Sequence, residues 1–116
     1  MALPKSGDKI LVMKEKWLCL ILGGHKTMEI RGNAFRQGKY YLGHKGVIYG
    51  EVQLGPPIFI DSDVQWRVLA PKHKVACATR PYKKTFGLPI TKMNRTRKFA
   101  YPHPRGAISI VRYRRN

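Results

Sequence analysis

Three charged side chains that suit nucleotide chemistry lie close together in residues 24–31, whose sequence is GHKTMEIR. The carboxylate of Glu29 can accept hydrogen bonds from the amino edge of a base, and the guanidinium of Arg31 can donate two hydrogen bonds to a phosphate or a base edge. Lys26 adds a point charge for phosphate, and Gly24 permits a positive φ or a close approach of the backbone to a ligand. Composition alone also allows a simpler interpretation, in which Glu29 pairs with Arg31 or Lys26 as a salt bridge on a strand surface.

A second group combines cations with aromatic rings. Aromatic residues between cations suit single-stranded RNA, because bases stack on the rings while phosphates meet the charges. In the alternative, Phe99 faces the core, which the sequence favours, whereas Tyr101 and His103 fit both interpretations equally. The cations of this group are Lys92, Arg95, Arg97, Lys98 and Arg105.

The net charge of +17 is distributed unevenly along the chain. All six acidic residues lie in residues 1–63, whereas residues 64–116 hold 14 of the 23 lysines and arginines. Such a segment repels itself, and binding to a polyanion relieves that repulsion. Because nucleic acid releases counterions when its phosphates are neutralised, the charge predicts contact with RNA or another nucleic acid.

Catalytic and metal-binding patterns are weaker. The four histidines, at positions 25, 44, 73 and 103, have no spacing typical of a metal site, and no phosphate-binding glycine loop occurs, so we expect no metal and no cofactor. A lysine desolvated near Arg31 can act as a base, although Glu29 would hold Lys26 protonated. If the protein is an enzyme, the candidate catalytic residues are therefore Lys26, Glu29 and Glu51.

The elements that must position these residues follow from periodicity. Residues 10–13 predict a buried strand, and residues 14–22 predict a helix that ends at Gly23 and Gly24. Residues 27–31 alternate polar and apolar, which predicts a strand with Thr27, Glu29 and Arg31 on one face. Cys19, within an apolar run, is expected to be a small buried residue, and Trp17 is expected in the core.

The rest of the chain predicts short strands and one more helix. Strands are expected at 39–42, 46–54, 86–93 and 107–113, with a bend or bulge at Gly50. A short helix capped within residues 61–63 should run to about residue 69, followed by loop with a short strand, and residues 94–106 should form a basic loop. One early helix among several bent strands favours a small α+β barrel in one domain, residues 1–116.

Residues 24–31 resemble the Gly-x-Lys-x-x-Glu-x-Arg signature of the ASCH family, in the PUA-like superfamily. The surroundings agree, because in that family the signature also follows a strand and an apolar helix. The resemblance extends over nearly the whole chain and implies a β-barrel of about five to six strands, with an N-terminal helix and a short second one. The sequence departs from the family at residues 86–88 (FGL), where many relatives have a Trp in one cleft wall.

The resemblance implies that the signature lines a cleft for RNA. The predicted binding residues are Gly24, Lys26, Glu29, Arg31, Lys92, Arg95, Arg97, Lys98, Tyr101, His103 and Arg105. Some ASCH proteins hydrolyse acetylated cytidine or cleave RNA, so a small amidohydrolase or ribonuclease using Lys26 is the alternative function. Glu29 stands where those amidohydrolases have a Thr. Because a carboxylate cannot replace a hydroxyl group one-for-one, their mechanism applies poorly to this chain. A third alternative is an accessory domain that docks on a ribosome or other ribonucleoprotein.

Localisation is suggested by what residues 1–116 lack. Only Cys19 and Cys77 occur, which predicts a reducing compartment. No apolar run approaches the roughly 20 residues that span a bilayer, and charged residues 14–16 argue against a signal peptide. The sequence therefore predicts a cytoplasmic protein that does not bind membranes.

Overall fold

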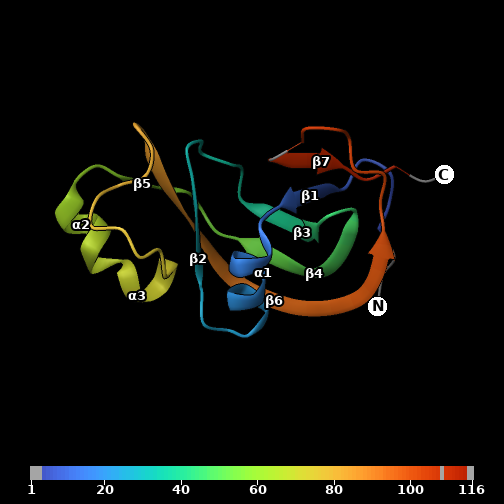
Figure 1. Cartoon of the computed structure of the whole chain (residues 1–116), viewed down its shortest axis with the longest axis horizontal. Coiled ribbons are helices and arrows are strands. Elements are labelled where there is room, and N and C mark those ends of the chain that lie inside the picture. The colour runs from blue at the N-terminus through green and yellow to red at the C-terminus, as the bar shows by residue number, and fades with distance from the viewer. Residues whose placement is uncertain (1–3, 108, 115–116) are drawn as a thin grey trace.

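The computed structural model describes residues 4–107 and 109–114, which form seven strands and three helices. In chain order the elements are β1 (Lys9–Val12), α1 (Glu15–Leu22), β2 (Met28–Arg31), β3 (Gly38–His44), β4 (Val47–Leu54), β5 (Ile58–Ile60), α2 (Asp63–Val68), α3 (Ala70–His73), β6 (Thr85–Ala100) and β7 (Ile110–Arg112). All seven strands belong to one mixed sheet that curls into an incomplete barrel (Figure 1). The predicted α+β class is confirmed, with one strand more than the expected five to six.

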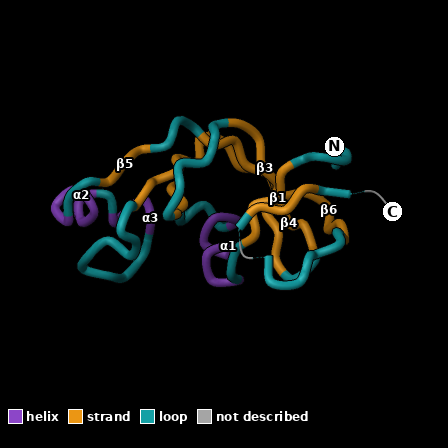
Figure 2. The backbone as a smooth tube through the Cα atoms, turned by 90° about the horizontal axis from the view of Figure 1, so that it is seen from above, coloured by secondary structure: helices purple, strands orange, loops and turns teal. Residues whose placement is uncertain are grey.

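The strand order explains how the sheet is built around its longest member. The order is β2-β6-β4-β3-β1-β7, and β5 also pairs with β6. The first half of β6 lies between β2 and β5, and its second half pairs antiparallel with β4. Among the described strands, only the β1–β3 pair is parallel. β6 therefore connects the two parts of the molecule seen in Figure 2, with α2, α3 and β5 at one end and β1, β3 and β4 at the other.

Three clusters of buried apolar side chains lie against this sheet. The largest is built on Leu11, Leu18, Ile21 and Leu42 between α1 and the sheet. A second cluster, around Tyr41 and Ile48, packs against the opposite face, and a third lies under α2. The third cluster consists of Met28, Ile30, Ile60 and Trp66, so that Met28 and Ile30 face the core as the strand alternation predicted.

Helix α1 forms because its apolar side chains recur at helical spacing. Leu18 and Ile21 are buried, and Trp17 and Leu22 pack beside them. The helix ends at Gly23, as predicted, and the next residue, Gly24, takes the left-handed conformation with a φ of 78°. The prediction that Cys19 is buried is wrong: its position on the helix faces away from the core, and it is exposed.

The segment after β4 contains two elements that the sequence did not reveal. β5 follows Pro56-Pro57, and α3 begins at Ala70 with Pro71 in its first turn, where the missing N–H of proline costs no helical hydrogen bond. Between them, α2 was predicted correctly, and the side chain of Ser62 caps it by accepting from the backbone N–H of Gln65. Trp66, for which the sequence made no assignment, is fully buried and stacks on the ring of His73 at 3.8 Å.

The basic stretch that was predicted to be a loop is mostly strand. β6 continues to Ala100, so Arg95, Arg97 and Lys98 lie on a strand rather than in the predicted loop over 94–106. β7 is correspondingly shorter than predicted. The expected irregularity at Gly50 is confirmed, because the β4–β6 register shifts between Ile48 and Gly50. Among the described residues, no helix is long and apolar enough to cross a membrane.

Candidate functional site

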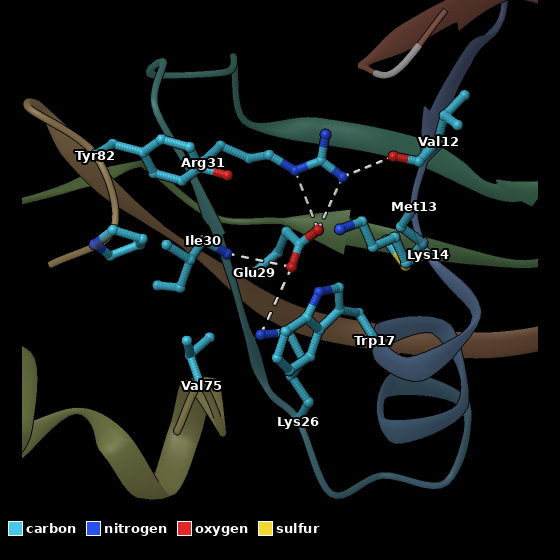
Figure 3. Close-up of a pocket in the computed structure, with 11 residues that line it drawn as sticks. Val12, Met13, Lys14, Trp17, Lys26, Glu29, Ile30, Arg31, Val75 and Tyr82 are labelled. Atoms are coloured by element: carbon cyan, nitrogen blue, oxygen red, sulfur yellow. Dashed lines mark hydrogen bonds and ion pairs between the residues drawn. The ribbon is translucent and has the colours of Figure 1, made fainter. Parts of the chain in front are cut away.

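A cavity of about 230 Å³ lies where the sheet fails to close, between β2 and the end of β1 (Figure 3). It is lined by the polar side chains of the predicted signature, by the first residues of α1 and by the loop before β6. Arg31 bridges the opening, because its Nη2 donates to the backbone oxygen of Val12 at 2.8 Å. The lining residues are Val12, Met13, Lys14, Trp17, Lys26, Glu29, Ile30, Arg31, Val75, Pro81 and Tyr82.

Lys26 is held at the bottom of this cavity, just before β2, with only 2% of its surface exposed. Its Nζ donates to the backbone oxygen of His73 at 2.5 Å and lies 3.6 Å from Oε1 of Glu29. It also lies 4.8 Å from the centre of the Trp17 ring, within cation–π distance. Burial lowers the pKa of Lys26 below its ordinary value, and the nearby charge of Glu29 opposes that shift.

Glu29 connects the two cations of the site. Its Oε2 accepts from Nη2 of Arg31 at 2.8 Å and from Nε at 3.1 Å, a forked pair that fixes the guanidinium plane. Its Oε1 accepts from the backbone N–H of Ile30 at 3.2 Å and faces Lys26. Both oxygens are therefore engaged inside the protein. Glu29 is placed to orient Lys26 and Arg31 rather than to contact a ligand itself.

The groups that remain open toward the cavity are mostly donors. Among the described residues, Nη1 of Arg31 has no hydrogen-bond partner, and Figure 3 shows it pointing away from Glu29. The exposed ammonium of Lys14 lies at the rim. With Lys14, Lys26 and Arg31 against Glu29, the lining has an excess of positive charge. Such a surface favours a ligand rich in acceptor atoms, such as a phosphate or the carbonyl edge of a base.

Two aromatic side chains line the cavity beside these polar groups. Trp17, expected in the core, packs against it with part of its ring and lines the cavity with the rest. Tyr82 is 47% exposed, and its ring lies next to Gly32, where an added Cβ would come within 3.4 Å of it. Trp17 and Tyr82 come from segments far apart in the sequence, yet both present apolar surface to a ligand in the cavity.

α3 supports the site from behind. The backbone oxygen of His73 that binds Lys26 is fixed because the imidazole ring is fully buried: Nε2 donates to the backbone oxygen of Trp66 at 3.0 Å, and Nδ1 accepts from the N–H of Val75 at 2.9 Å. This tautomer is neutral. Burial lowers the pKa of His73, and the charge of Lys26 lowers it further, with the Trp66 contact opposing.

Some predicted site residues lie away from the cavity. Thr27 is exposed and Gly24 lies at the end of α1, and neither lines the cavity. Glu51 lies in a separate hollow, where it pairs with Nζ of Lys39 at 3.1 Å. The structure does not bring Lys26 and Glu51 together, because the two residues line different cavities.

The predicted cations of β6 point to different surfaces. Lys92 lines the same outer hollow as Glu51. Arg95 turns the other way, and its Nη2 donates to the backbone oxygen of Leu22 at the end of α1, at 3.3 Å. Lys98 lies 5.6 Å from the ring centre of Tyr49, and Arg97 is exposed. These cations are therefore spread along β6, and they do not line the cavity.

The loop after β6 places Tyr101 differently from one of its two predicted roles. Tyr101 is only 5% exposed and belongs to the second core cluster, so the interpretation that it stacks on bases is wrong. Its hydroxyl lies 3.1 Å from Nδ1 of His103, which is exposed. Phe99 packs against the same cluster, as favoured. Arg105 is exposed.

Lys14, Trp17 and Tyr82 are the site residues that sequence reasoning missed. Tyr82 lies in an aperiodic loop, and no local pattern placed it near β2. Lys14 and Trp17 were read as part of an amphipathic helix, which says which face is apolar but not what lies at its end. No group of three or more potential metal ligands occurs among residues 4–107 and 109–114.

A curled mixed sheet with one early helix packed against it and a polar cavity at its open seam defines the class of fold: it is that of ASCH domain proteins. A crystal structure of a point mutant of ZmASCH, from Zymomonas mobilis, matches with a TM-score of 0.73 and 11% sequence identity, covering 97% of this chain and 92% of that one. The expected ASCH-type fold is thereby confirmed. No family model and no curated protein matches the sequence.

Proposed function

We propose that this protein binds RNA by holding one nucleotide in the cavity between β1 and β2. The observation that carries the proposal is the network of Lys26, Glu29 and Arg31, which runs from the bottom of a solvent-open cavity to its opening. Burying Lys26 and Glu29, with Arg31 partly buried beside them, is costly, and a hydrophobic replacement of such a network is often no less stable. A ligand that uses the preoriented guanidinium gives the network a functional reason to be there.

The size of the cavity limits the ligand. Pockets for drug-sized ligands measure about 300–1,000 Å³, so a cavity of about 230 Å³ suits one base or one phosphate with part of its sugar. The remainder of an RNA chain must lie outside. The exposed cations of β6 and of the loop after it, such as Lys92 and Arg105, would meet its phosphates.

Nucleotide binding can be tested with Arg31→Lys, which keeps the charge but loses the fork between Glu29, Val12 and the ligand. We expect binding of nucleoside monophosphates, measured by calorimetry, to weaken at least about tenfold, since hydrogen bonds to charged groups contribute about 1.5–3 kcal/mol. The matched control is Arg36→Lys, because Arg36 is exposed and, among residues 4–107 and 109–114, only its backbone oxygen is engaged, accepting from the hydroxyl of Tyr40. Equal affinities of the two variants would contradict the proposal.

The contribution of β6 is tested by its salt dependence. Replacing Lys92, Arg97 and Lys98 by Ala should weaken binding of different RNA sequences about equally and flatten the dependence of affinity on salt. Binding of a single nucleotide should change little. If the dependence of affinity on salt concentration is unchanged, these cations do not contribute to RNA binding.

A second candidate function is hydrolysis, which the lowered pKa of the buried Lys26 favours. The geometry gives it fewer groups than expected, because Glu51 lies elsewhere and Glu29 holds Lys26 charged. Acetylated cytidine and labelled single-stranded RNA should be incubated with the protein and with Lys26→Met. Turnover that the variant loses would establish an enzyme, whereas binding without turnover supports a binding module.

We further propose that residues 1–116 act as one RNA-binding domain in the cytoplasm. The thiols of Cys19 and Cys77 are free and exposed, which suits a reducing compartment.

A further inference from the structure

A row of side chains continues from the cavity across three strands. Arg31 on β2 is in register with Phe86 on β6, and Phe86 is in register with Phe59 on β5. Residues directly opposite each other in an antiparallel pair project from the same face of the sheet. Arg31, Phe86 and Phe59 therefore lie side by side on the face that carries the cavity, and this row leads away from it toward β5.

The outer member of the row is unusually exposed for its type. Phe59 has 50% of its surface exposed, and its ring lies 5.3 Å from that of Phe86, centre to centre, at an angle of 45°. Phe86 packs against the largest core cluster, which fixes the inner ring and provides a base on which the outer one rests. By contrast, Ile60, the next residue on β5, points to the opposite face and is fully buried under α2. Phe59 is therefore more exposed than either of its neighbours on β5, since Ile58 is 37% exposed and Ile60 is fully buried.

The surroundings of the row favour one occupant. The face is continuous with the cavity through Arg31, and the cavity wall residue Tyr82 lies in the loop that leads into β6. The same loop carries Lys83 and Lys84, both exposed, immediately before Thr85, which pairs with Ile60 at the end of β5. Asp61 is the acidic residue nearest in sequence to that end. Exposed rings beside cations are typical of protein surfaces that bind single-stranded RNA, because bases stack on the rings while phosphates meet the charges.

We propose that Phe59, resting on Phe86, is a second base-stacking subsite for single-stranded RNA, next to the nucleotide in the cavity. This inference rests on the proposed function, because it places the neighbouring nucleotide of the same strand. Two strand spacings of about 4.8 Å separate β2 from β5, so the subsite lies about 10 Å from the backbone of Arg31. The protein therefore binds a dinucleotide or a longer strand more tightly than a mononucleotide.

The test compares a nucleoside monophosphate with a single-stranded oligonucleotide of four to six residues, using Phe59→Ala. We expect unchanged affinity for the monophosphate and about 5- to 150-fold weaker binding of the oligonucleotide, the range for loss of one base–ring stack. Phe59→Trp should restore or strengthen oligonucleotide binding. Val64→Ala is the matched control, because Val64 is 65% exposed and lies on α2.

Each other outcome is decisive. If the parent protein binds both ligands and Phe59→Ala binds the oligonucleotide as the parent does, the subsite is absent while the cavity proposal stands. If the parent binds neither ligand, the proposed function itself is wrong, and the subsite with it. If Phe59→Ala instead converts a dimer to a monomer in sedimentation, with RNA affinity unchanged, the row is a contact between two copies of the chain.

Discussion

Replacing Glu29 by Gln should destabilise the protein by about 3 kcal/mol at neutral pH. Glu29 is 4% exposed and pairs with two cations, of which Lys26 is 2% exposed. Removing one partner of a buried ion pair costs about 3–5 kcal/mol, because the remaining charge stays buried without compensation. The low end of that range applies, since the Gln oxygen can still accept from Arg31 and Arg31 keeps its bond to Val12.

That loss should be measurable as a melting temperature. With an unfolding entropy of about 2.1 cal/mol/K per residue, 3 kcal/mol lowers the Tm of a chain of this length by roughly 12 °C. Circular dichroism and urea titrations give both quantities. Glu51→Gln is the control, because its pair with Lys39 is partly exposed and should contribute at most about 1 kcal/mol.

The pH dependence gives the same variant a second signature. The folded-state pKa of Lys26 lies below its ordinary value of 10.5, so between the two values the unfolded chain binds more protons and stability rises with pH. Glu29 raises the pKa of Lys26, so Glu29→Gln lowers it further. The pH range over which stability rises then extends to lower pH. The deficit of the variant should therefore shrink as pH rises toward 10.5. A loss equal to that of Glu51→Gln, or one independent of pH, would refute the view that Glu29 compensates two buried cations.

Three further expectations concern other parts of the structure. Because the pKa of the fully buried His73 is lowered, the unfolded chain binds more protons below about pH 6.5, and unfolding titrations should show stability falling as pH drops from 7 to 5; His73→Gln should lose this dependence. Gly43→Val should lower the free energy of unfolding by about 1–3 kcal/mol in urea titrations, because an added Cβ would lie 2.6 Å from Cγ2 of Ile10 and 2.9 Å from the hydroxyl of Tyr101. The control is Gly106→Ala: its Cβ would meet open space, so this variant tests only the cost of its positive φ. Phe86→Ala should both destabilise the protein and weaken oligonucleotide binding, because its ring packs against the core and carries Phe59; full stability in thermal melts would contradict that packing.

The parts of the fold that were predicted well depend on local patterns. β1, α1, β2, β3 and β4 appear within a few residues of their expected bounds, because alternation, helical spacing and glycine stops act over short stretches. The second half of β6 was missed because its exposed cations lack an apolar rhythm. Pairing with β4, far away in the sequence, holds that segment extended. Cys19 was misplaced because an apolar run was read without its helical phase.

The candidate site divides in the same way. Lys26, Glu29 and Arg31 come together because they are close in sequence, on one turn and the strand that follows it. Their proximity could therefore be predicted from the sequence. Trp17 and Tyr82 reach the cavity only because the sheet curls, and the same curling places Glu51 in a different hollow from Lys26. The resemblance assigned Glu29 to the ligand, whereas composition alone also allowed a salt bridge with Arg31 or Lys26. The structure contains that salt bridge, and both oxygens of Glu29 are occupied by the protein's own donors.

The position of β6 in the chain bears on how the molecule assembles. β2, β4 and β5 each pair with it, and Thr85–Ala100 comes late in the sequence. During synthesis on the ribosome, those three strands emerge before their partner and leave unsatisfied edges until it arrives. Contacts between such distant segments slow folding, so the nascent chain should depend on chaperones most during that interval, and substitutions that weaken β6 should reduce the yield of folded protein more than its final stability.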